Sequence, residues 1–355
     1  MSKGRMTRAF RWSLIALCSA SLFLVSCCGR QPEAERRHHT HEGFRNSDAE
    51  ESTGFLDFLK WRWERLHKDI PPPEAYDFPL SENDPEFLQS NETCTTLTWI
   101  GHATVLIQVD GKNILTDPHF SERASPVQWA GPKRAVPPGI SLHELPVIHM
   151  VLISHDHYDS LDKESIRMLR ARRGGDHTVF FVPLGLKGWF EHLGVQNVME
   201  LDWWDRQERI GLEVVAVPLR HWSKRSLFSR NETLWAGWAV LSPRFRFLFV
   251  GDSGYGAMFQ SIGEALGPFD LAAIPIGAYE PRWFMRTHHM NPEEAVQVHL
   301  DVRSRKSLAI HWGTFVLTDE PLDRPPEELE EAKKRAGIAD EAFVVLKHGE
   351  TMVLE

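Results

Sequence analysis

The segment His155-Asp156-His157-Tyr158-Asp159 limits what this chain can fold into more than any other stretch. It follows an apolar run at residues 147–153, which predicts a buried strand. Two imidazoles and one carboxylate therefore leave the end of that strand together, where a tight turn can direct all three to one point. Histidine nitrogens and aspartate oxygens are ligands of catalytic zinc sites, which keep one coordination position open for water. A polar surface loop is the alternative, so a metal site needs further ligands from other strand ends.

Three later side chains stand at the ends of predicted strands in the same way. His221 follows the strand at residues 212–217, Asp252 follows the strand at 245–250, and His311 ends the strand at 307–311. Each alone is a weak signal, but their shared position predicts one metal site with six ligands: His155, His157, Asp159, His221, Asp252 and His311. Asp252 lies in a Gly-Asp-Ser-Gly motif, and a nucleophilic serine there has no second feature to support it.

Strands and helices alternate through residues 93–355, which form the predicted catalytic domain. The pattern predicts helices at residues 163–173, 186–193 and 292–302, and strands at residues 96–100, 105–109, 113–116, 179–182, 198–201, 212–217, 234–241, 245–250, 271–276 and 307–311. The third helix has a strong start at Asn291-Pro292-Glu293-Glu294. This order is typical of an α/β fold with two sheets between layers of helices. The Pro- and Gly-containing residues 121–146 form a long loop, a length that is usually functional.

Residues 1–27 are predicted to be a targeting segment. A basic start precedes an apolar stretch at residues 12–26 that is too short for a confident transmembrane helix. The stretch ends at Leu24-Val25-Ser26-Cys27, which resembles a bacterial lipoprotein box. That pattern implies cleavage before Cys27 and lipidation of Cys27, and hence a membrane-anchored lipoprotein on the periplasmic or extracellular face of the cell envelope. An ordinary secretory signal or an uncleaved anchor is the alternative.

Residues 28–92 are predicted to be a linker and an amphipathic extension. The polar residues 29–53 read as a solvated linker, in which His38, His39 and His41 are composition rather than a metal site. Residues 55–66 predict a helix that docks on the domain or lies on a membrane, and docking is the preferred interpretation. Its predicted apolar face contains Phe55, Leu59, Trp63 and Leu66.

Charge and cysteine content exclude two classes of protein. The chain of 355 residues has a net charge of −9 and no long basic run, so nucleic acid is not an expected partner. Its four cysteines are too few for a disulfide framework. Thirteen Trp residues fit either an apolar core or contact with a membrane interface.

Long motifs between residues 96 and 350 resemble the metallo-β-lactamase superfamily and, within it, the family of N-acyl-phosphatidylethanolamine-hydrolysing phospholipases D. The motifs are TWIGHAT at residues 98–104, LTDP at 115–118, LDWW at 201–204, the stretch 267–285 and AIHWGTF at 309–315. The resemblance implies an αββα sandwich of two mixed sheets flanked by helices, with two zinc ions. His155, His157 and His221 would bind one zinc, Asp159 and His311 the other, and Asp252 would bridge them.

The resemblance also identifies two departures, at Ser160 and His288, and three substrate contacts. The family has a further histidine ligand directly after the motif aspartate, where this chain has Ser160, so the second zinc site is expected to be weaker. His102 and His119, which both follow strands, are the candidates to replace it. His289 matches a family histidine near the substrate phosphate, and His288 stands where the family usually has glutamine. The predicted substrate contacts are Tyr158, His288 and His289, and the predicted catalytic residues are Asp252 and His289.

The implied reaction is hydrolysis of N-acyl-phosphatidylethanolamine, a membrane phospholipid, to an N-acylethanolamine and phosphatidic acid. Zinc supplies the hydroxide at neutral pH, Asp252 orients it, and His289 donates to the phosphate or to the leaving oxygen. The family resemblance also suggests a homodimer. A lactonase of the same superfamily is the first alternative, and β-lactamase activity is disfavoured. A catalytically impaired lipid-binding lipoprotein is the second alternative, which only Ser160 favours.

Overall fold

The computed structural model describes residues 36–47 and 53–354. The predicted targeting segment and Cys27 lie outside these residues, so their assignment stays a prediction. Within the described part of the chain, no helix is long and apolar enough to cross a membrane.

The first of two seven-stranded sheets has the order β16-β3-β4-β5-β6-β7-β8. Pairing is antiparallel from β16 to β5 and parallel from β5 to β8, so the sheet is mixed. Asp110-Gly111 forms the predicted tight turn between β4 and β5. The strands are β3 (Thr95–Gly101), β4 (Thr104–Val109), β5 (Lys112–Thr116), β6 (Met150–Leu152), β7 (Val179–Pro183), β8 (Val198–Leu201) and β16 (Thr351–Leu354).

The second sheet has the order β15-β14-β13-β12-β11-β10-β9 and is mixed in the same way. Pairing is antiparallel from β9 to β12 and parallel from β12 to β15. The strands are β9 (Arg206–Arg209), β10 (Leu212–Val217), β11 (Gly237–Leu241), β12 (Arg246–Phe249), β13 (Phe269–Pro275), β14 (Ser304–Ile310) and β15 (Phe343–Val344).

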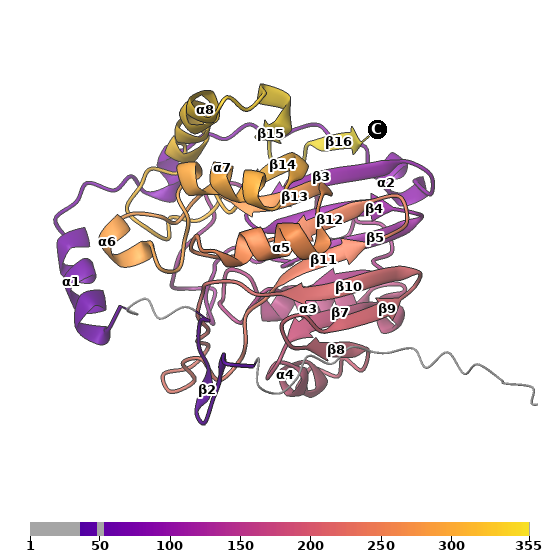
Figure 1. Ribbon diagram of the computed structural model, residues 1–355, viewed down its shortest axis with the longest axis horizontal. Helices are drawn as coiled ribbons and strands as arrows, with labels where there is room; N and C mark the ends of the chain where they lie inside the picture. The colour runs from indigo at the N-terminus through magenta and orange to yellow at the C-terminus, as the bar shows by residue number, and fades with distance from the viewer. Residues whose placement is uncertain (1–35, 48–52, 355) are drawn as a thin grey trace, which may run out of the picture. The chain divides into compact units, whose positions relative to one another are not determined.

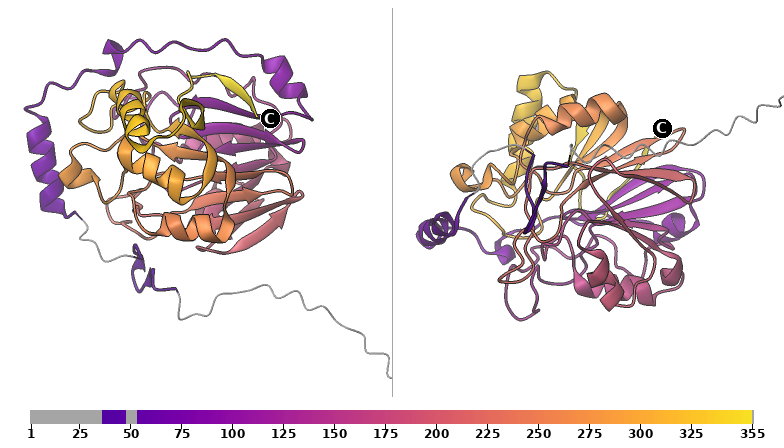
Figure 2. Two further views of the ribbon diagram at one scale, coloured as in Figure 1. Left: turned by 45° about the horizontal axis from the view of Figure 1, so that its top comes forward. Right: turned by 60° about the horizontal axis from the view of Figure 1, so that its bottom comes forward.

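Helices cover the outer face of each sheet, which gives the αββα sandwich (Figures 1 and 2). On the first sheet, α3 (Lys163–Ala171) and α4 (Lys187–His192) pack against side chains such as Leu106 and Val151. On the second, the covering helices are α5 (Met258–Leu266), α7 (Pro292–Asp301) and α8 (Arg324–Ala336). Alternate residues of β4 face opposite layers, Leu106 toward the helices and Ile107 toward the other sheet. Strands buried on both faces explain the continuous apolar runs in the sequence.

Two helix starts follow directly from the predicted capping residues. The Asp162 side chain accepts hydrogen bonds from the N–H groups of Glu164 and Ser165 at the start of α3. Asn291 and Glu294 form a capping box at the start of α7, with Pro292 in its first turn. These caps fix where each helix begins, and the loops before them therefore have defined ends.

The expectation of a solvated linker is wrong for residues 36–46. A short hairpin, β1 (His39–Thr40) with β2 (Gly43–Phe44), follows His38, whose ring is buried and stacks 4.2 Å from Trp203. His38 Nε2 and His39 Nε2 lie 2.6 and 2.8 Å from the two oxygens of Asp202. The carboxylate of Asp202 is buried, so it needs such partners, and the histidines of the extension supply them.

Helix α1 (Phe55–Arg65) does dock on the domain, but through a different face from the predicted one. Trp61 is its buried residue, and the indole Nε1 donates to Asp319 Oδ1 at 3.1 Å while the ring stacks on Phe284. The predicted apolar face points to solvent instead: Phe55, Leu59, Trp63 and Leu66 are exposed. Two further short helices are α2 (Pro85–Ser90), whose Leu88 packs on the first sheet, and α6 (Arg282–Met285), which contacts α1.

Candidate metal centre

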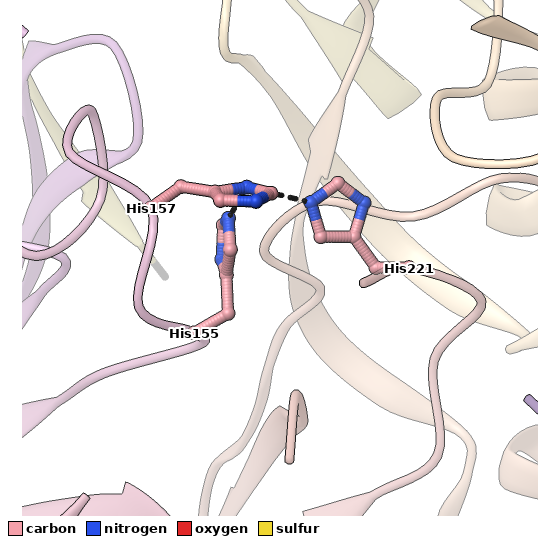
Figure 3. Close-up of side chains that lie close together, drawn as sticks. All are labelled: His155, His157 and His221. Carbon is pink, nitrogen blue, oxygen red and sulfur yellow. Dashed lines mark hydrogen bonds between the residues drawn. The ribbon is translucent and has the colours of Figure 1, made fainter. Parts of the chain in front are cut away.

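Three histidines that follow strands of different sheets converge at one edge of the sandwich. His155 and His157 lie in the loop after β6, and His221 lies in the loop after β10 (Figure 3). His157 Nδ1 is 2.8 Å from His155 Nε2 and 3.2 Å from His221 Nε2. Zinc–nitrogen bonds of about 2.0–2.1 Å bring the ligands of one ion to within about 3.5 Å of one another. These three nitrogens are therefore arranged as ligands of one cation.

A second group of ligand atoms lies beside the first. Asp159 Oδ2 is 3.1 Å from His102 Nε2 and 3.3 Å from His311 Nε2, and the two imidazole rings are 4.0 Å apart. The potential ligand atoms of these three residues lie within 4.8 Å of one another. His102 comes from the β3–β4 turn, and His311 directly follows β14. His102 was only a candidate in the sequence, and the structure places it in this group of possible ligands.

Asp252 lies between the two groups and faces both. Its Oδ2 is 3.8 Å from His155 Nε2 and 3.9 Å from His221 Nε2, and its Oδ1 is 3.1 Å from His311 Nε2. Asp252 follows β12, where Gly251 adopts a φ of +67°. A Cβ on Gly251 would meet the Ser154 Cβ at 2.6 Å, so only glycine lets the loop pass this closely. The structure thus brings all six predicted ligands together.

Hydrogen bonds behind two of the histidines select the tautomer that a metal needs. Ser154 Oγ donates to Asp117 and therefore accepts from His155 Nδ1, at 2.8 Å. His221 Nδ1 donates to the carbonyl of His288 at 2.9 Å. In both rings the proton is on Nδ1, and the lone pair of Nε2 points into the site. Asp117 lies in the LTDP motif at residues 115–118, and no pattern in the sequence indicates this role.

Burial and charge divide the site into neutral and charged parts. Burial is the main cause that holds the pKa of His155 well below its usual range, and the neighbouring imidazoles lower it further. Burial and the imidazole of His221 lower the pKa of His157 to about 4. Burial also lowers the pKa of His311, but the carboxylates of Asp252 and Asp159 outweigh it and raise that pKa to about 10. The first group therefore offers neutral ligands, while the second stabilises positive charge between two carboxylates.

The donor set fits a divalent transition metal. Imidazole nitrogens with carboxylate oxygens suit zinc, iron or manganese, whereas calcium and magnesium prefer oxygen ligands alone. His157 Nε2 and Ser160 Oγ are buried and have no hydrogen-bond partner among the described residues. The residues present therefore fit the implied two-metal centre.

The metal groups open into a cavity of about 540 Å³. His157, Asp159 and Asp252 line it together with His288 and His289. Its apolar wall consists of Phe55, Phe58, Trp61, Trp222, Leu227, Phe284 and Met285, and its cationic residues are Lys224 and Arg230. The ligand atom of His289 also lies within 4.8 Å of those of His221 and Asp252. His288 and His289 are thus placed beside the metal groups, and their role as substrate contacts stays a prediction.

Tyr158 does not line this cavity, which corrects its prediction as a substrate contact there. Asp156 and Tyr158 border a different hollow from the cavity that His157 and Asp159 line. The Tyr158 hydroxyl donates to the carbonyl of Arg225 at 2.9 Å, and the side chain borders a separate hollow of about 820 Å³.

The hydroxyl of Ser253 is not arranged as a nucleophile, because its Oγ donates to the carbonyl of Gly254 and accepts the Arg220 N–H.

His119 and the histidines of the extension lie outside the centre. His119 is buried against Phe315, and neither ring nitrogen has a hydrogen-bond partner among the described residues. It belongs to none of the ligand groups found in the described part of the chain. His38, His39 and Asp202 do form such a group, but Arg36 already pairs with that carboxylate at 3.0 Å.

Known proteins place this geometry in a family. The model described as "Beta-lactamase superfamily domain" matches residues 112–312. The chain is 44% identical over 265 residues to N-acyl-phosphatidylethanolamine-hydrolyzing phospholipase D 1 of Caenorhabditis elegans, covering 71% of this chain and 74% of that protein. It is 32% identical over 312 residues to the mitochondrial N-acyl-phosphatidylethanolamine-hydrolyzing phospholipase D of Saccharomyces cerevisiae, covering 83% of this chain and 66% of the other.

A solved structure shares the fold. Igni18, a metallo hydrolase of the archaeon Ignicoccus hospitalis, superposes with a TM-score of 0.57 at 23% identity, covering 74% of this chain and 99% of that one. The likeness therefore extends over the sandwich of sheets and helices that positions the ligand groups.

Proposed function

Because the chain belongs to the metallo-β-lactamase superfamily, and within it to the family of the N-acyl-phosphatidylethanolamine-hydrolysing phospholipases D, we propose that it is a zinc-dependent phosphodiesterase of the phospholipase D type. Its substrate is N-acyl-phosphatidylethanolamine, and its products are an N-acylethanolamine and phosphatidic acid. The observation that carries the proposal is the pair of ligand groups with Asp252 between them, at the inner end of an apolar cavity.

The metals and the protein have separate tasks in this reaction. Two bound zinc ions supply a water of lowered pKa and neutralise charge on the phosphodiester. Asp252 is placed to accept a hydrogen bond from the attacking water, which orients it toward phosphorus. His289 lines the cavity and has a buried Nδ1 without a partner among the described residues. A neutral imidazole there can donate one hydrogen bond to the phosphate or to the leaving oxygen.

The cavity suits a charged headgroup joined to acyl chains. Phe58, Trp222 and Phe284 line it with aromatic rings that can contact hydrocarbon. Lys224 and Arg230 contribute positive charge, and the Arg230 guanidinium lies 5.2 Å from the ring of Trp222. A phosphodiester carries negative charge, so these two side chains help to hold it near the metal groups.

The substrate is reached at a lipid surface through α1. This helix lines the cavity with Phe55, Phe58 and Trp61, and its Leu56, Trp63 and Leu66 are exposed outside the cavity lining. Contiguous exposed apolar residues next to a binding cavity favour a membrane contact.

A lipid anchor at Cys27 in the cell envelope would keep the protein there. Replacing Cys27 with Ala should release the protein from host membranes, and unchanged fractionation with an unchanged N-terminal mass would argue against the anchor.

Turnover of a defined substrate tests the proposal. The purified protein is incubated with N-acyl-phosphatidylethanolamine in detergent micelles, and both products are identified by mass spectrometry. We expect release of N-acylethanolamine that a strong chelator abolishes and added zinc restores. A lactone substrate tested in parallel distinguishes a lactonase. A folded, zinc-loaded protein that leaves the phospholipid intact would refute the proposed substrate, and full activity after complete metal removal would refute the metal dependence.

A further inference from the structure

We propose that His102 completes the second metal site of this chain, in place of the family histidine that Ser160 has replaced. The inference rests on the proposed two-metal function and assigns one of its ligands. The ligands of the second site are then His102, Asp159 and His311, with Asp252 shared between the two sites. With His102 as a ligand, the second site has as many protein ligands as the family site that contains the histidine after the motif aspartate. We therefore no longer expect this site to bind zinc more weakly.

Position 160 cannot supply the ligand itself. A serine hydroxyl is a poor zinc ligand at neutral pH, whereas neutral imidazole is a good one. Ser160 is fully buried, and its hydroxyl has no hydrogen-bond partner among the described residues. A buried polar atom without a protein partner is unusual, and a bound ion or water next to it is one explanation.

The ring of His102 is held at the position that a ligand requires. Its Nε2 is 3.1 Å from Asp159 Oδ2, on the same oxygen that His311 Nε2 approaches to 3.3 Å. The rings of His102 and His311 are 4.0 Å apart and inclined by 40°. His102 and His311 therefore approach the same carboxylate oxygen with their rings close together, as two ligands of one ion would.

The backbone at His102 leaves it little freedom to move. Its φ is +53°, in the left-handed region that a residue with a side chain rarely adopts. Its N–H donates to Thr314 Oγ1 at 2.9 Å. Its carbonyl accepts the His311 N–H at 2.9 Å and the Trp99 indole N–H at 3.0 Å. Three hydrogen bonds therefore fix His102 relative to His311, and the two ligands form one rigid unit across the sheets.

His119 is the alternative replacement, and its surroundings argue against it. Both of its ring nitrogens lack partners among the described residues, but they join no ligand group there. The ring packs edge-to-face on Phe315 with the centroids 4.9 Å apart. His119 is therefore a matched control: it is a buried histidine near the site that should not bind the ion.

Metal counting on four proteins tests the inference. Each protein is loaded with zinc and dialysed extensively, and the zinc content per chain is then measured by elemental mass spectrometry. The four proteins are the parent, His102→Ala, His119→Ala and the double variant His102→Ala with Ser160→His. We expect two zinc ions per chain in the parent and in His119→Ala, and one in His102→Ala. The double variant should recover the second ion, because the imidazole returns from position 160.

Crystals of the zinc-loaded parent give a test that needs no variant. The anomalous signal of zinc should show a second ion next to His102 Nε2, Asp159 and His311. Two retained ions in folded His102→Ala, or a second ion that does not contact His102 in the parent, would overturn the inference. Two ions at the stated ligands with no turnover of the phospholipid would refute only the proposed substrate, so the two failures are distinguishable.

Discussion

Individual residues in the centre do two different things: some hold a cation and others hold the ligands. His155 and His221 each keep a proton on Nδ1 because Ser154 and the carbonyl of His288 accept it. Such outer contacts fix the ring and its tautomer, and losing one typically weakens metal binding about 10–100-fold. Asp117, which accepts from Ser154, thus contributes to the site without touching it.

Removing a ligand should reduce turnover far more than it reduces folding. We expect His221→Ala and Asp252→Asn each to lower kcat by at least about 100-fold, because each loses several kcal/mol of charge stabilisation. Steady-state kinetics on N-acyl-phosphatidylethanolamine measures the loss, and thermal melting checks that the protein is folded. His119→Ala is the control and should retain turnover. Near-parental kcat in either ligand variant would show that its assigned role is wrong.

A buried histidine far from the centre should make the fold sensitive to acid. His299 is 5% exposed, and its Nδ1 lies 2.8 Å from Ser307 Oγ. Burial lowers its pKa below the usual 6.5, so the unfolded chain binds a proton more readily than the folded one below about pH 6.5. The stability that the neutral ring contributes is therefore present above that pH and is lost as the pH falls.

Denaturation curves between pH 7 and pH 5 measure this effect. His299→Gln should flatten the decline in unfolding free energy by up to about 1 kcal/mol per pH unit. The exposed His143 provides the control variant, His143→Gln. If the parent and His299→Gln lose stability in parallel, His299 is not the source of the acid sensitivity.

What the sequence reveals about the site depends on how local the signal is. Six ligands were predicted because each one ends a strand, and that position can be recognised from neighbouring residues. His102 could be named only as a candidate, since its partner His311 lies on the other sheet and more than two hundred residues along the chain. Tyr158 was misplaced because the motif shows which residues are close in sequence but not which side of the loop each one faces.

Among the elements, α1 shows what a helical pattern can and cannot predict. The spacing of apolar residues correctly indicates a helix, but the pattern does not say which face meets the protein. Asp319 decides that: it binds the Trp61 indole, Arg65 at 2.7 Å and Lys68 at 2.7 Å. These three contacts of Asp319 hold the Trp61 side chain against the domain, and the side chains of Trp63 and Leu66 are left 67% and 74% exposed.

The outer face of α1 should therefore govern binding to lipid. In protein with Cys27→Ala, which carries no anchor, Trp63→Ser with Leu66→Ser should weaken binding to anionic phospholipid vesicles at least about tenfold, because each large apolar side chain contributes about 1.5–3 kcal/mol when buried. Val353→Ser on β16, 56% exposed in the parent, is the matched control. Vesicle co-sedimentation measures the affinity. Equal sedimentation of all three proteins would remove α1 from the membrane contact.

Other elements escaped the sequence pattern for physical reasons. Helix α8 is rich in charged residues, and only a narrow stripe that includes Leu329 and Ala332 is buried, so its periodicity is weak. Strand β16 is at the end of the catalytic domain's sequence and pairs with β3 at its beginning. A local sequence pattern does not indicate such a distant partner strand. The doubly buried strands of the two sheets were recognisable because both of their faces are apolar.

For the molecule as a whole, each metal group takes ligands from both sheets. His155 and His157 follow β6 of the first sheet, whereas His221 follows β10 of the second. His102 and Asp159 belong to the first sheet and its loops, whereas His311 and Asp252 follow strands of the second. Neither the group His155, His157 and His221 nor the group His102, Asp159 and His311 is complete on one sheet, so these two groups exist only when the sandwich is assembled.

Metal loading should consequently raise the melting temperature. A ligand that binds only the folded state at 100 times its Kd adds about 2.7 kcal/mol. For a domain of this size that corresponds to several degrees for each site. Calorimetry of chelated and zinc-loaded protein measures the shift, and His102→Ala should show a smaller one than His119→Ala. Identical melting with and without zinc would contradict the placement of the ligands on both sheets.

The same arrangement makes each ion a reversible cross-link. A disulfide ties two segments permanently, but a tie made by a cation lasts only as long as free metal is available outside the protein. Loss of the metal would then abolish catalysis and, at the same time, weaken the packing of the two sheets against each other. We expect the chain deprived of metal to be a better substrate for proteases, so that the amount of folded protein follows the supply of metal.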